Sequence, residues 1–187
     1  MSALADDGLP RCDWALSTPD YLAYHDEEWG RELRDDRGLY ERMTLESFQS
    51  GLSWITILRK RPAFREAFAG FDPEVVGSYG QADFDRLMAD AGIVRNRAKI
   101  NAAIANARAM LALGDGVLTD LLWSFAPAGP RPAPRTLADV PATSPESVAM
   151  SKTLKKNGFV FLGPTTCYAL MQATGMVNDH LADCSAR

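Results

Sequence analysis

The sequence contains only two histidines, and each lies close to a cysteine. Cys12 precedes His25 by thirteen residues, and Cys184 follows His180 by four. Two thiolates and two neutral imidazoles form a complete tetrahedral set for zinc, and four protein ligands leave no coordination position for a reacting water. The spacing therefore predicts a structural zinc site that joins the two ends of the chain. Two ordinary histidines, or a disulfide between Cys12 and Cys184, are the alternatives.

A second group of residues combines large aromatic side chains with acidic ones. Its members in the N-terminal third are Trp14, Tyr21, Tyr24, Trp29, Glu46 and Trp54. A buried carboxylate walled by aromatic rings can receive a flat, cationic base, because the rings supply stacking and cation–π attraction and the carboxylate accepts a hydrogen bond from an amine. Aromatic residues of a helical protein more often fill the core, so a base pocket and an ordinary core both remain open on these residues alone.

The histidine at position 25 also begins a triplet of the form H-x-E, His25-Asp26-Glu27. Nucleobase deaminases carry this triplet beside a catalytic zinc, but they also require a P-C-x-x-C motif. The sequence has no such motif, which excludes a deaminase of that kind.

The segment around Gly92 predicts a helix, a tight turn and a second helix. Ala91 and Gly92 follow an apolar helical pattern, and Arg95, Arg97 and Lys99 lead into an alanine-rich run. In helix-hairpin-helix modules the exposed backbone amides of such a turn grip a phosphate, aided by the N-terminus of the second helix and by nearby cations. A plain connector between helices is the alternative.

The composition bounds the size and class of the protein. A chain of 187 residues with 47% hydrophobic residues can bury one core, or two small lobes around a shared cleft. No apolar run of about 18 residues occurs and the N-terminus lacks the pattern of a signal peptide, so we expect a cytoplasmic protein without a membrane span. A third cysteine, Cys167, brings the total to three, too few for a disulfide framework.

The net charge of −4 and the isoelectric point near 5.2 argue against a nucleic-acid binder, because duplex DNA is a polyanion. A local basic face can still act while acidic residues lie elsewhere. The candidates for such a face are Arg59-Lys60-Arg61, Arg95 with Arg97 and Lys99, and Lys152 with Lys155 and Lys156.

Apolar residues recur at helical spacing along most of the chain. The runs cover residues 39–52, 64–71, 84–91 and 100–111, and they predict amphipathic helices. Asp72-Pro73 and Ser144-Pro145 combine a helix N-cap with proline at the first helical position. The only strand candidate is the short apolar run at 159–162. The expected class is all-α.

The expected organisation is one unit spanning residues 11–184, with two helical lobes around a cleft. Residues 1–10 are expected to form a flexible arm, and residues 185–187 a short tail. Residues 126–135 contain Pro127, Pro130, Pro132 and Pro134 and predict an extended connection. The segment after it is too small to hold a core of its own, so we expect it to pack against the N-terminal part.

Taken together, these residues resemble the 3-methyladenine DNA glycosylase I family through a series of motifs in chain order. In the N-terminal part the motifs are Arg11-Cys12-x-Trp14, Tyr21-x-x-Tyr24-His25-Asp26-x-Glu28-Trp29-Gly30 and Leu45-Glu46-x-x-Gln49-x-Gly51-Leu52-Ser53-Trp54. Further along they are Asp90-Ala91-Gly92-Ile93, Lys99-Ile100, Asn106-Ala107-Arg108, Trp123-Ser124-Phe125, Ser151-Lys152-x-Leu154-Lys155-Lys156-x-Gly158-Phe159 and Met171-Gln172-Ala173-x-Gly175-x-Val177-Asn178-Asp179-His180. Phe48, Pro164 and Ala169 depart from what relatives often carry.

The resemblance implies a role for each matching residue. It implies a helix-hairpin-helix glycosylase fold, one structural Zn²⁺ on Cys12, His25, His180 and Cys184, and Glu46 as the carboxylate that recognises the methylated adenine. It also implies that Tyr24 and Trp54 stack on or edge the base, and that Trp14 and Tyr21 complete the wall. The implied DNA contacts are Gln49, Gly51, Leu52, Gly92, Val94, Arg95 and Lys99.

The resemblance further implies a base-excision repair enzyme that flips 3-methyladenine out of double-stranded DNA and removes it by hydrolysis, without lyase activity. Its partners would be duplex DNA with alkylated purines and the free base as product, and we expect a monomer. A zinc-stabilised protein that binds alkylated bases or damaged DNA without cleavage is the alternative. A structural helical adaptor is a third possibility.

Overall fold

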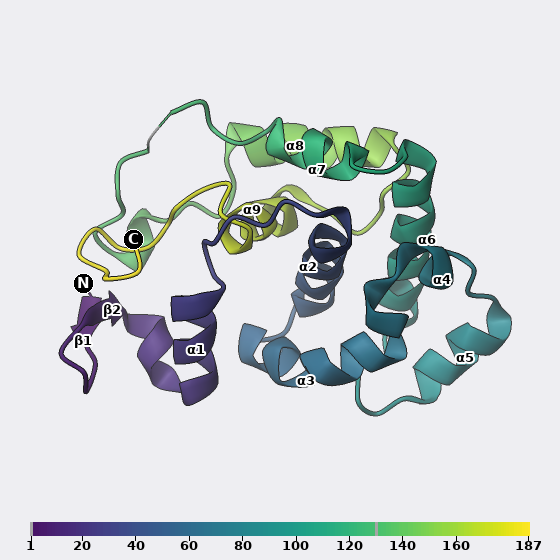
Figure 1. Cartoon of the computed structure of the whole chain (residues 1–187), viewed down its shortest axis with the longest axis horizontal. Coiled ribbons are helices and arrows are strands. Elements are labelled where there is room, and N and C mark those ends of the chain that lie inside the picture. Colours follow the sequence, from purple (N-terminus) through teal and green to yellow (C-terminus); the bar gives the residue numbers. More distant parts are fainter. Residues whose placement is uncertain (1, 130) are drawn as a thin grey trace.

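The structure is a computed structural model that describes residues 2–129 and 131–187, and across these residues it is mainly helical (Figure 1). The helices are α1 (Pro19–Glu27), α2 (Asp36–Gln49), α3 (Trp54–Ala67), α4 (Pro73–Gly77), α5 (Gln81–Ala89), α6 (Arg97–Leu113), α7 (Val117–Trp123), α8 (Pro145–Lys156) and α9 (Pro164–Ala173). Two short strands, β1 (Ser2–Leu4) and β2 (Pro10–Cys12), pair in antiparallel fashion. Short 3-10 turns span Asp13–Ser17, Ala69–Phe71 and Leu137–Asp139. The helical class expected from the sequence is confirmed.

The helix starts expected from the sequence lie where side chains can cap them. The Asp72 carboxylate accepts a hydrogen bond from the Glu74 amide at 3.0 Å, and the Ser144 hydroxyl accepts one from the Ser147 amide at 3.2 Å. Pro73 and Pro145 are the first residues of α4 and α8. Each cap supplies an acceptor to an amide that has no partner inside its own helix.

Helix α2 lies in the middle of the molecule, and other helices surround it (Figure 1). Its residues Leu39, Met43 and Phe48 are fully buried. The hydroxyl of Tyr40 donates to the carbonyl oxygen of Ala103 on α6 at 2.9 Å, because a buried phenol needs a hydrogen-bond partner. A side chain carried by α2 is therefore held by packing on several sides.

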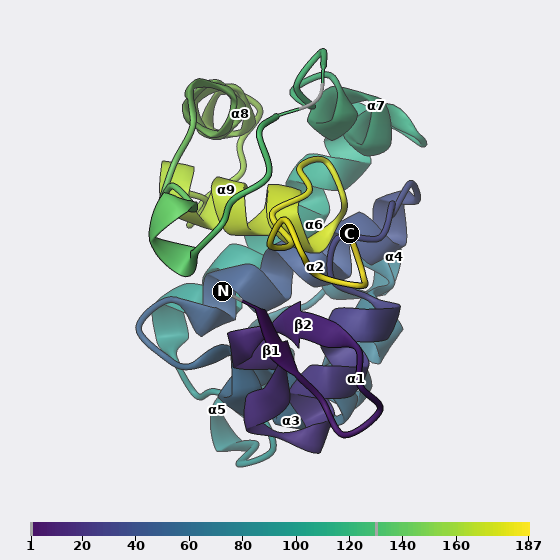
Figure 2. The same ribbon diagram turned by 90° about the vertical axis from the view of Figure 1, so that its left-hand side faces the viewer.

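The C-terminal segment returns to the N-terminal part, as its small size predicts. The Leu33 amide donates to the Thr174 carbonyl oxygen at 3.2 Å, and the Ser185 amide donates to the Pro10 carbonyl oxygen at 2.8 Å. Figure 2 shows the C-terminal segment above the β1–β2 ribbon. The two ends of the chain thus lie side by side.

The structure corrects the sequence analysis at three places. The strand candidate at 159–162 is not a strand: this segment is a loop in which Phe161 has a φ of +64°. The N-terminal segment contains β1 and β2, where no strand was expected. The periodic run at 39–52 extends beyond its helix, because α2 ends at Gln49 and Gly51 adopts a φ of +80°.

The expected extended connection holds neither helix nor strand at 126–129 and 131–135, and Pro130 lies outside the described residues. The connection is anchored where the Ala182 amide donates to the Pro134 carbonyl oxygen at 2.8 Å. Among the described residues, no helix has the length and apolar character that crossing a membrane requires.

Candidate functional site

A cavity of about 280 Å³ lies between the N-terminal 3-10 turn and helices α1, α2, α3 and α9. Five of its lining residues are aromatic residues singled out from the sequence, namely Trp14, Tyr21, Tyr24, Trp29 and Trp54. The others are Glu46, Gln49, Ala169 and Gln172. The volume lies just below the range of about 300–1,000 Å³ that is typical of small-molecule pockets, so the cavity suits a single flat ring system.

The aromatic rings form a continuous wall. The ring centroids of Tyr24 and Trp54 lie 5.4 Å apart, and those of Trp14 and Tyr21 lie 5.5 Å apart at nearly right angles. The Tyr21 hydroxyl accepts a hydrogen bond from the Ile55 amide at 2.9 Å, which ties α1 to the first turn of α3. The buried Trp54 Nε1 donates to no described residue, and an unpaired buried donor costs free energy unless a ligand accepts from it.

Glu46 is the acidic residue of the cavity, and its exposed fraction is only 6%. Among the described residues, none donates a hydrogen bond to its carboxylate. Burial raises the pKa of Glu46 to about 7, and the nearby positive charge of Arg42 works in the opposite direction. A carboxylate with so little solvation gains strongly from a cation placed beside it.

Arg42 lies one helical turn before Glu46 on α2 and belongs to a partly buried ionic network. Its guanidinium and that of Arg61 both pair with the Glu28 carboxylate, with Arg61 Nη1 at 2.6 Å from Glu28 Oε2. Burial alone would raise the pKa of Glu28, but the hydrogen bond from Arg61 and the charges of both arginines lower it to about 2. The Arg42 guanidinium carbon lies 5.4 Å from the Tyr24 ring centroid. The network therefore supports one wall of the cavity from behind.

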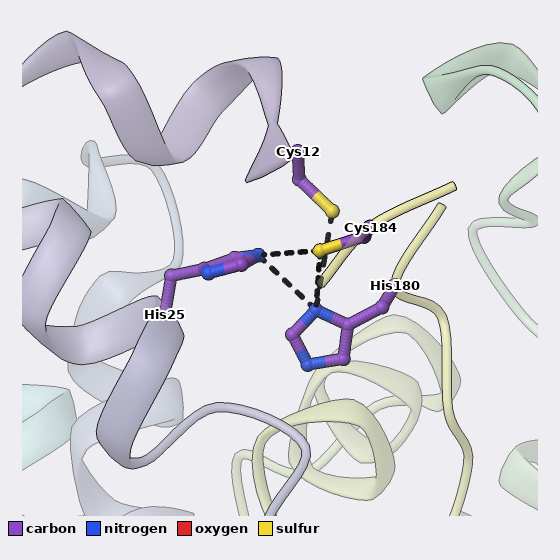
Figure 3. Close-up of side chains that lie close together, drawn as sticks. All are labelled: Cys12, His25, His180 and Cys184. Carbon is purple, nitrogen blue, oxygen red and sulfur yellow. Dashed lines mark hydrogen bonds between the residues drawn. The ribbon is translucent and has the colours of Figure 1, made fainter. Parts of the chain in front are cut away.

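The four predicted metal ligands come together in a buried cluster (Figure 3). The ligand atoms of Cys12, His25, His180 and Cys184 all lie within 4.8 Å of one another. His180 Nδ1 is 3.1 Å from His25 Nε2 and 3.6 Å from Cys184 Sγ, which is itself 3.4 Å from His25 Nε2. In a tetrahedral zinc site, the usual Zn–S and Zn–N bond lengths would place the ligand atoms about 3.3–3.8 Å from one another. The residues present therefore fit the metal.

Surrounding groups orient each ligand. With His25 Nε2 turned toward the cluster, its Nδ1 lies 2.8 Å from Asp26 Oδ1, and His180 Nε2 lies 3.1 Å from the Trp29 carbonyl oxygen. The Leu181 amide donates to Cys12 Sγ at 3.4 Å. Carboxylate, carbonyl and amide partners of this kind fix the tautomer and direction of metal ligands. The cluster therefore has the environment of a metal site as well as its donor set.

The loop between α2 and α3, residues 50–53, borders the cavity. The Gln49 side-chain amide donates to the Leu52 carbonyl oxygen at 2.9 Å, and the Leu52 amide donates to the Gln49 carbonyl oxygen at 2.7 Å. These bonds close a tight turn in which Leu52 remains 38% exposed. The loop thus joins two residues of the cavity lining, Gln49 and Trp54, and presents a partly exposed apolar side chain between them in the chain.

The turn between α5 and α6, residues 90–96, is the expected hairpin. The Gly92 amide is capped by Asp90 Oδ1 at 2.7 Å. The amides of Ile93, Val94 and Arg95 donate to no acceptor among the described residues, and the Arg95 side chain is exposed. The turn therefore offers free amides next to a cation, as phosphate binding requires.

Lys99 differs from the expectation that its side chain contacts DNA. It is only 6% exposed, and its Nζ donates to the carbonyl oxygens of Phe48 at 2.8 Å and Ser50 at 2.6 Å. Its ammonium faces the end of α2, so it has no free path to a phosphate.

The family model described as methyladenine glycosylase matches residues 14–187. The chain belongs to the methyladenine glycosylase family. DNA-3-methyladenine glycosylase 1 of Escherichia coli (strain K12) is 46% identical to this glycosylase over 179 residues, which cover 94% of this chain and 96% of the relative.

Solved structures show the same similarity. A crystal structure of 3-methyladenine DNA glycosylase I matches with a TM-score of 0.89 at 46% identity, covering 94% of this glycosylase and 98% of the solved chain. A tyrosine-to-phenylalanine variant of such an enzyme, in complex with 3-methyladenine, matches with a TM-score of 0.88 at 36% identity, covering 94% and 96%. The family membership and enzyme class inferred from the sequence motifs are confirmed.

The structure of this glycosylase also adds residues that the sequence analysis did not assign to the site. Trp29, Ala169 and Gln172 line the cavity. Trp29 stood within the aromatic group, whereas no sequence pattern pointed Ala169 or Gln172 toward the cavity. Arg42 could have been found from its spacing, because residues four apart on a helix share a face.

Proposed function

We propose that this glycosylase removes 3-methyladenine from alkylated double-stranded DNA by hydrolysis, without lyase activity. The observation that carries the proposal is the position of Glu46, a buried carboxylate in a small aromatic cavity. Methylation at N3 gives adenine a positive charge, and the undamaged base is neutral. A poorly solvated anion surrounded by aromatic rings distinguishes the two by charge as well as by shape.

The charge of the lesion also explains why little acid catalysis is needed. The glycosidic bond of a cationic base is already weakened, and the base leaves as a neutral molecule. Glu46 accepts a hydrogen bond from the amino edge of the base and stabilises the positive charge that develops on the sugar while water attacks. Among the residues that the structure describes, no lysine lines the cavity, which supports hydrolysis over a Schiff-base lyase reaction.

DNA binding in this proposal divides between two elements. The free amides at Ile93, Val94 and Arg95 hold a backbone phosphate, and the loop carrying Gly51 and Leu52 enters the gap left by the extruded base. Gln49 links the loop to the cavity, because its side chain lines the cavity and donates to the Leu52 carbonyl oxygen. A second hollow of about 580 Å³, lined in part by Ser50 and Lys155, borders the same loop.

One structural zinc, held by Cys12, His25, His180 and Cys184, completes the proposal. Its chemistry is to neutralise buried thiolates and cross-link the chain ends, and four protein ligands leave no position for a reactant. The ligands are chain neighbours of the cavity wall: Trp14 follows Cys12 closely, and Tyr24 directly precedes His25. The metal thus positions aromatic rings and takes no part in the reaction.

The experiment that tests the function incubates the protein with methylated duplex DNA and measures free 3-methyladenine. We expect base release with an intact phosphodiester backbone and an abasic site. Damaged DNA that is bound without any base release would establish the non-catalytic binder instead. A helical adaptor would also leave tryptophan fluorescence unchanged when free 3-methyladenine is added, whereas rings that surround the base must respond.

A further inference from the structure

Lys99 is a buried cation without an acidic partner among the described residues. It lies in the first turn of α6, where the Asn96 side chain caps its amide at 3.1 Å. Its ammonium bonds the carbonyl oxygens of Phe48 and Ser50, which lie at the C-terminal end of α2. Carbonyl groups at a helix C-terminus lack donors inside the helix and carry the negative end of its dipole. Lys99 therefore caps α2 from another helix.

Lys60 makes the reciprocal connection. It belongs to α3, and its Nζ donates to the carbonyl oxygens of Ala91 and Gly92, each at 3.0 Å. Lys99 thus extends from α6 to the C-terminal end of α2. Lys60 extends from α3 to the turn at 90–96. Each forms two charge-assisted hydrogen bonds to backbone carbonyls, which are stronger than bonds between neutral groups.

These bonds fix the direction of the peptide groups that the proposed function uses. In a planar trans peptide the carbonyl and the next amide point in opposite directions. Holding the Gly92 carbonyl toward Lys60 therefore turns the Ile93 amide away from α3, toward a ligand of the turn. Holding the Ser50 carbonyl toward Lys99 fixes the peptide that enters Gly51, the residue with a φ of +80° that sets the exposed position of Leu52.

We propose that Lys60 and Lys99 are positioning residues that form a reciprocal clamp between the phosphate-gripping turn at 90–96 and the loop at 50–53. Through this clamp, phosphate binding at the turn holds the loop in the geometry that keeps the base extruded into the cavity. The inference rests on the proposed function. It differs from a merely structural role for the two lysines, because the clamp contributes to excision from DNA and not to the cavity itself.

The test uses Lys99→Met and Lys60→Met, which keep the length of the side chain and remove the donors. Arg135→Met is the matched control, since Arg135 is an exposed cation in the connection before the Leu137–Asp139 turn and lies outside the proposed DNA-binding elements. Three quantities are measured in the zinc-loaded full chain: affinity for free 3-methyladenine from tryptophan fluorescence, affinity for undamaged duplex, and the single-turnover rate of 3-methyladenine release at saturating methylated duplex. The half-buried Lys60 provides a variant that leaves the core intact if Lys99→Met does not fold.

We expect both clamp variants to lower the single-turnover rate about 10- to 100-fold, because small misplacements of bound groups cost rates of this size. Affinity for the free base stays within about twofold, since the cavity is unchanged. The double variant loses less than the product of the two single losses, because either substitution already breaks the clamp. Arg135→Met leaves the single-turnover rate and the free-base affinity at their wild-type values.

Two results would overturn the clamp alone: clamp variants that release base at the wild-type rate, or variants whose free-base affinity falls in parallel with the rate. The second result would assign the lysines to fold maintenance. A wild-type protein that releases no base from methylated duplex would overturn the proposed function and the clamp with it.

Discussion

The ring of Trp14 meets the ring of His25 edge to face, with centroids 5.2 Å apart. The same indole lies 5.1 Å from the ring of Trp29, whose carbonyl oxygen lies 3.1 Å from His180 Nε2. Aromatic side chains of the cavity wall are therefore in direct contact with ligands of the Cys/His cluster. A change in the position of a metal ligand has a short path to the rings that would surround a base.

Removal of a metal ligand should destabilise the protein and loosen the cavity. We expect about one zinc per chain in the wild type, and a fall in melting temperature on chelation, because a structural metal binds only the folded state. Cys184→Ala should lose the zinc and also bind free 3-methyladenine more weakly. Cys167→Ala is the matched control: this cysteine is equally buried but lies outside the cluster, so its variant should keep the metal. Elemental analysis and calorimetry check both variants, and a Cys184→Ala protein with full zinc content would contradict the site.

Gly30 lies against His180 and cannot be replaced without moving it. A Cβ at Gly30 would lie 2.9 Å from His180 Nε2, and the residue has a φ of +78°. Gly116 has a similar φ of +76° with nothing within 4 Å of its Cβ position. Gly116→Ala should therefore cost only the backbone strain, about 1–2 kcal/mol. Gly30→Ala should cost more and lower the zinc affinity about 10- to 100-fold, as changes around metal ligands typically do. Equal unfolding free energies and zinc affinities for the two variants would show that the contact with His180 has no consequence.

The burial of Glu46 should destabilise the protein at alkaline pH. Its pKa rises from 4.5 in the unfolded chain to about 7 in the folded protein. Because the pKa is raised on folding, the folded protein gains stability from the protonated Glu46 side chain. This contribution to the free energy of unfolding is fully present below pH 4.5 and is lost as the pH rises through about 7. Glu46→Gln, which stays neutral, should be more stable than the wild type at pH 9 by about 1–3 kcal/mol. Urea unfolding at a series of pH values should show this difference shrink toward zero near pH 4.5, and a variant less stable than the wild type at pH 9 would refute the burial cost.

The turn at 90–96 should contribute to DNA affinity irrespective of the base sequence of the duplex. Arg95→Glu should weaken binding to all duplexes and reduce the salt dependence of binding, because it removes a phosphate contact. Arg135→Glu makes the same change in charge at an exposed position in the connection that runs beside the C-terminal segment. Fluorescence anisotropy over a range of salt concentrations should separate the two. If DNA affinity depended on salt concentration with the same slope in both variants, only the net charge of the protein would determine that affinity. The turn at 90–96 would then have no specific role in DNA binding.

Much of the helical framework could be predicted from the sequence, because its information is local. The caps at Asp72 and Ser144 depend on neighbouring residues, and both were found. The loop at 159–162 could not be predicted, because its conformation depends on a distant residue: the Asn106 side chain exchanges two hydrogen bonds with the Val160 backbone, at 3.1 and 2.8 Å. Its apolar composition made it a strand candidate, but among the described residues it pairs with no strand.

The residues of the candidate site also differ in how far the sequence could predict them. The residue types of the metal ligands and of the aromatic wall suggested their chemistry, and the fold then brought them together. Lys99 was expected at a phosphate because lysine is cationic and follows the turn, but helix geometry points its side chain toward the end of α2. Gln172 was missed because its place in the cavity depends on the packing of α9 against α2, which no local pattern encodes.

The most direct test of the central claim is the single-turnover release of 3-methyladenine from methylated duplex by Glu46→Gln at pH 8, beside Glu41→Gln on the same helix. Glu41 pairs with Arg65 outside the cavity, so its variant controls for the loss of one carboxylate. We predict that Glu46→Gln keeps its zinc and its fold and loses about 100-fold or more in rate, as removal of a key electrostatic group does, while Glu41→Gln keeps the wild-type rate. Release of 3-methyladenine by Glu46→Gln at the wild-type rate would contradict the claim that the buried carboxylate selects the charged base.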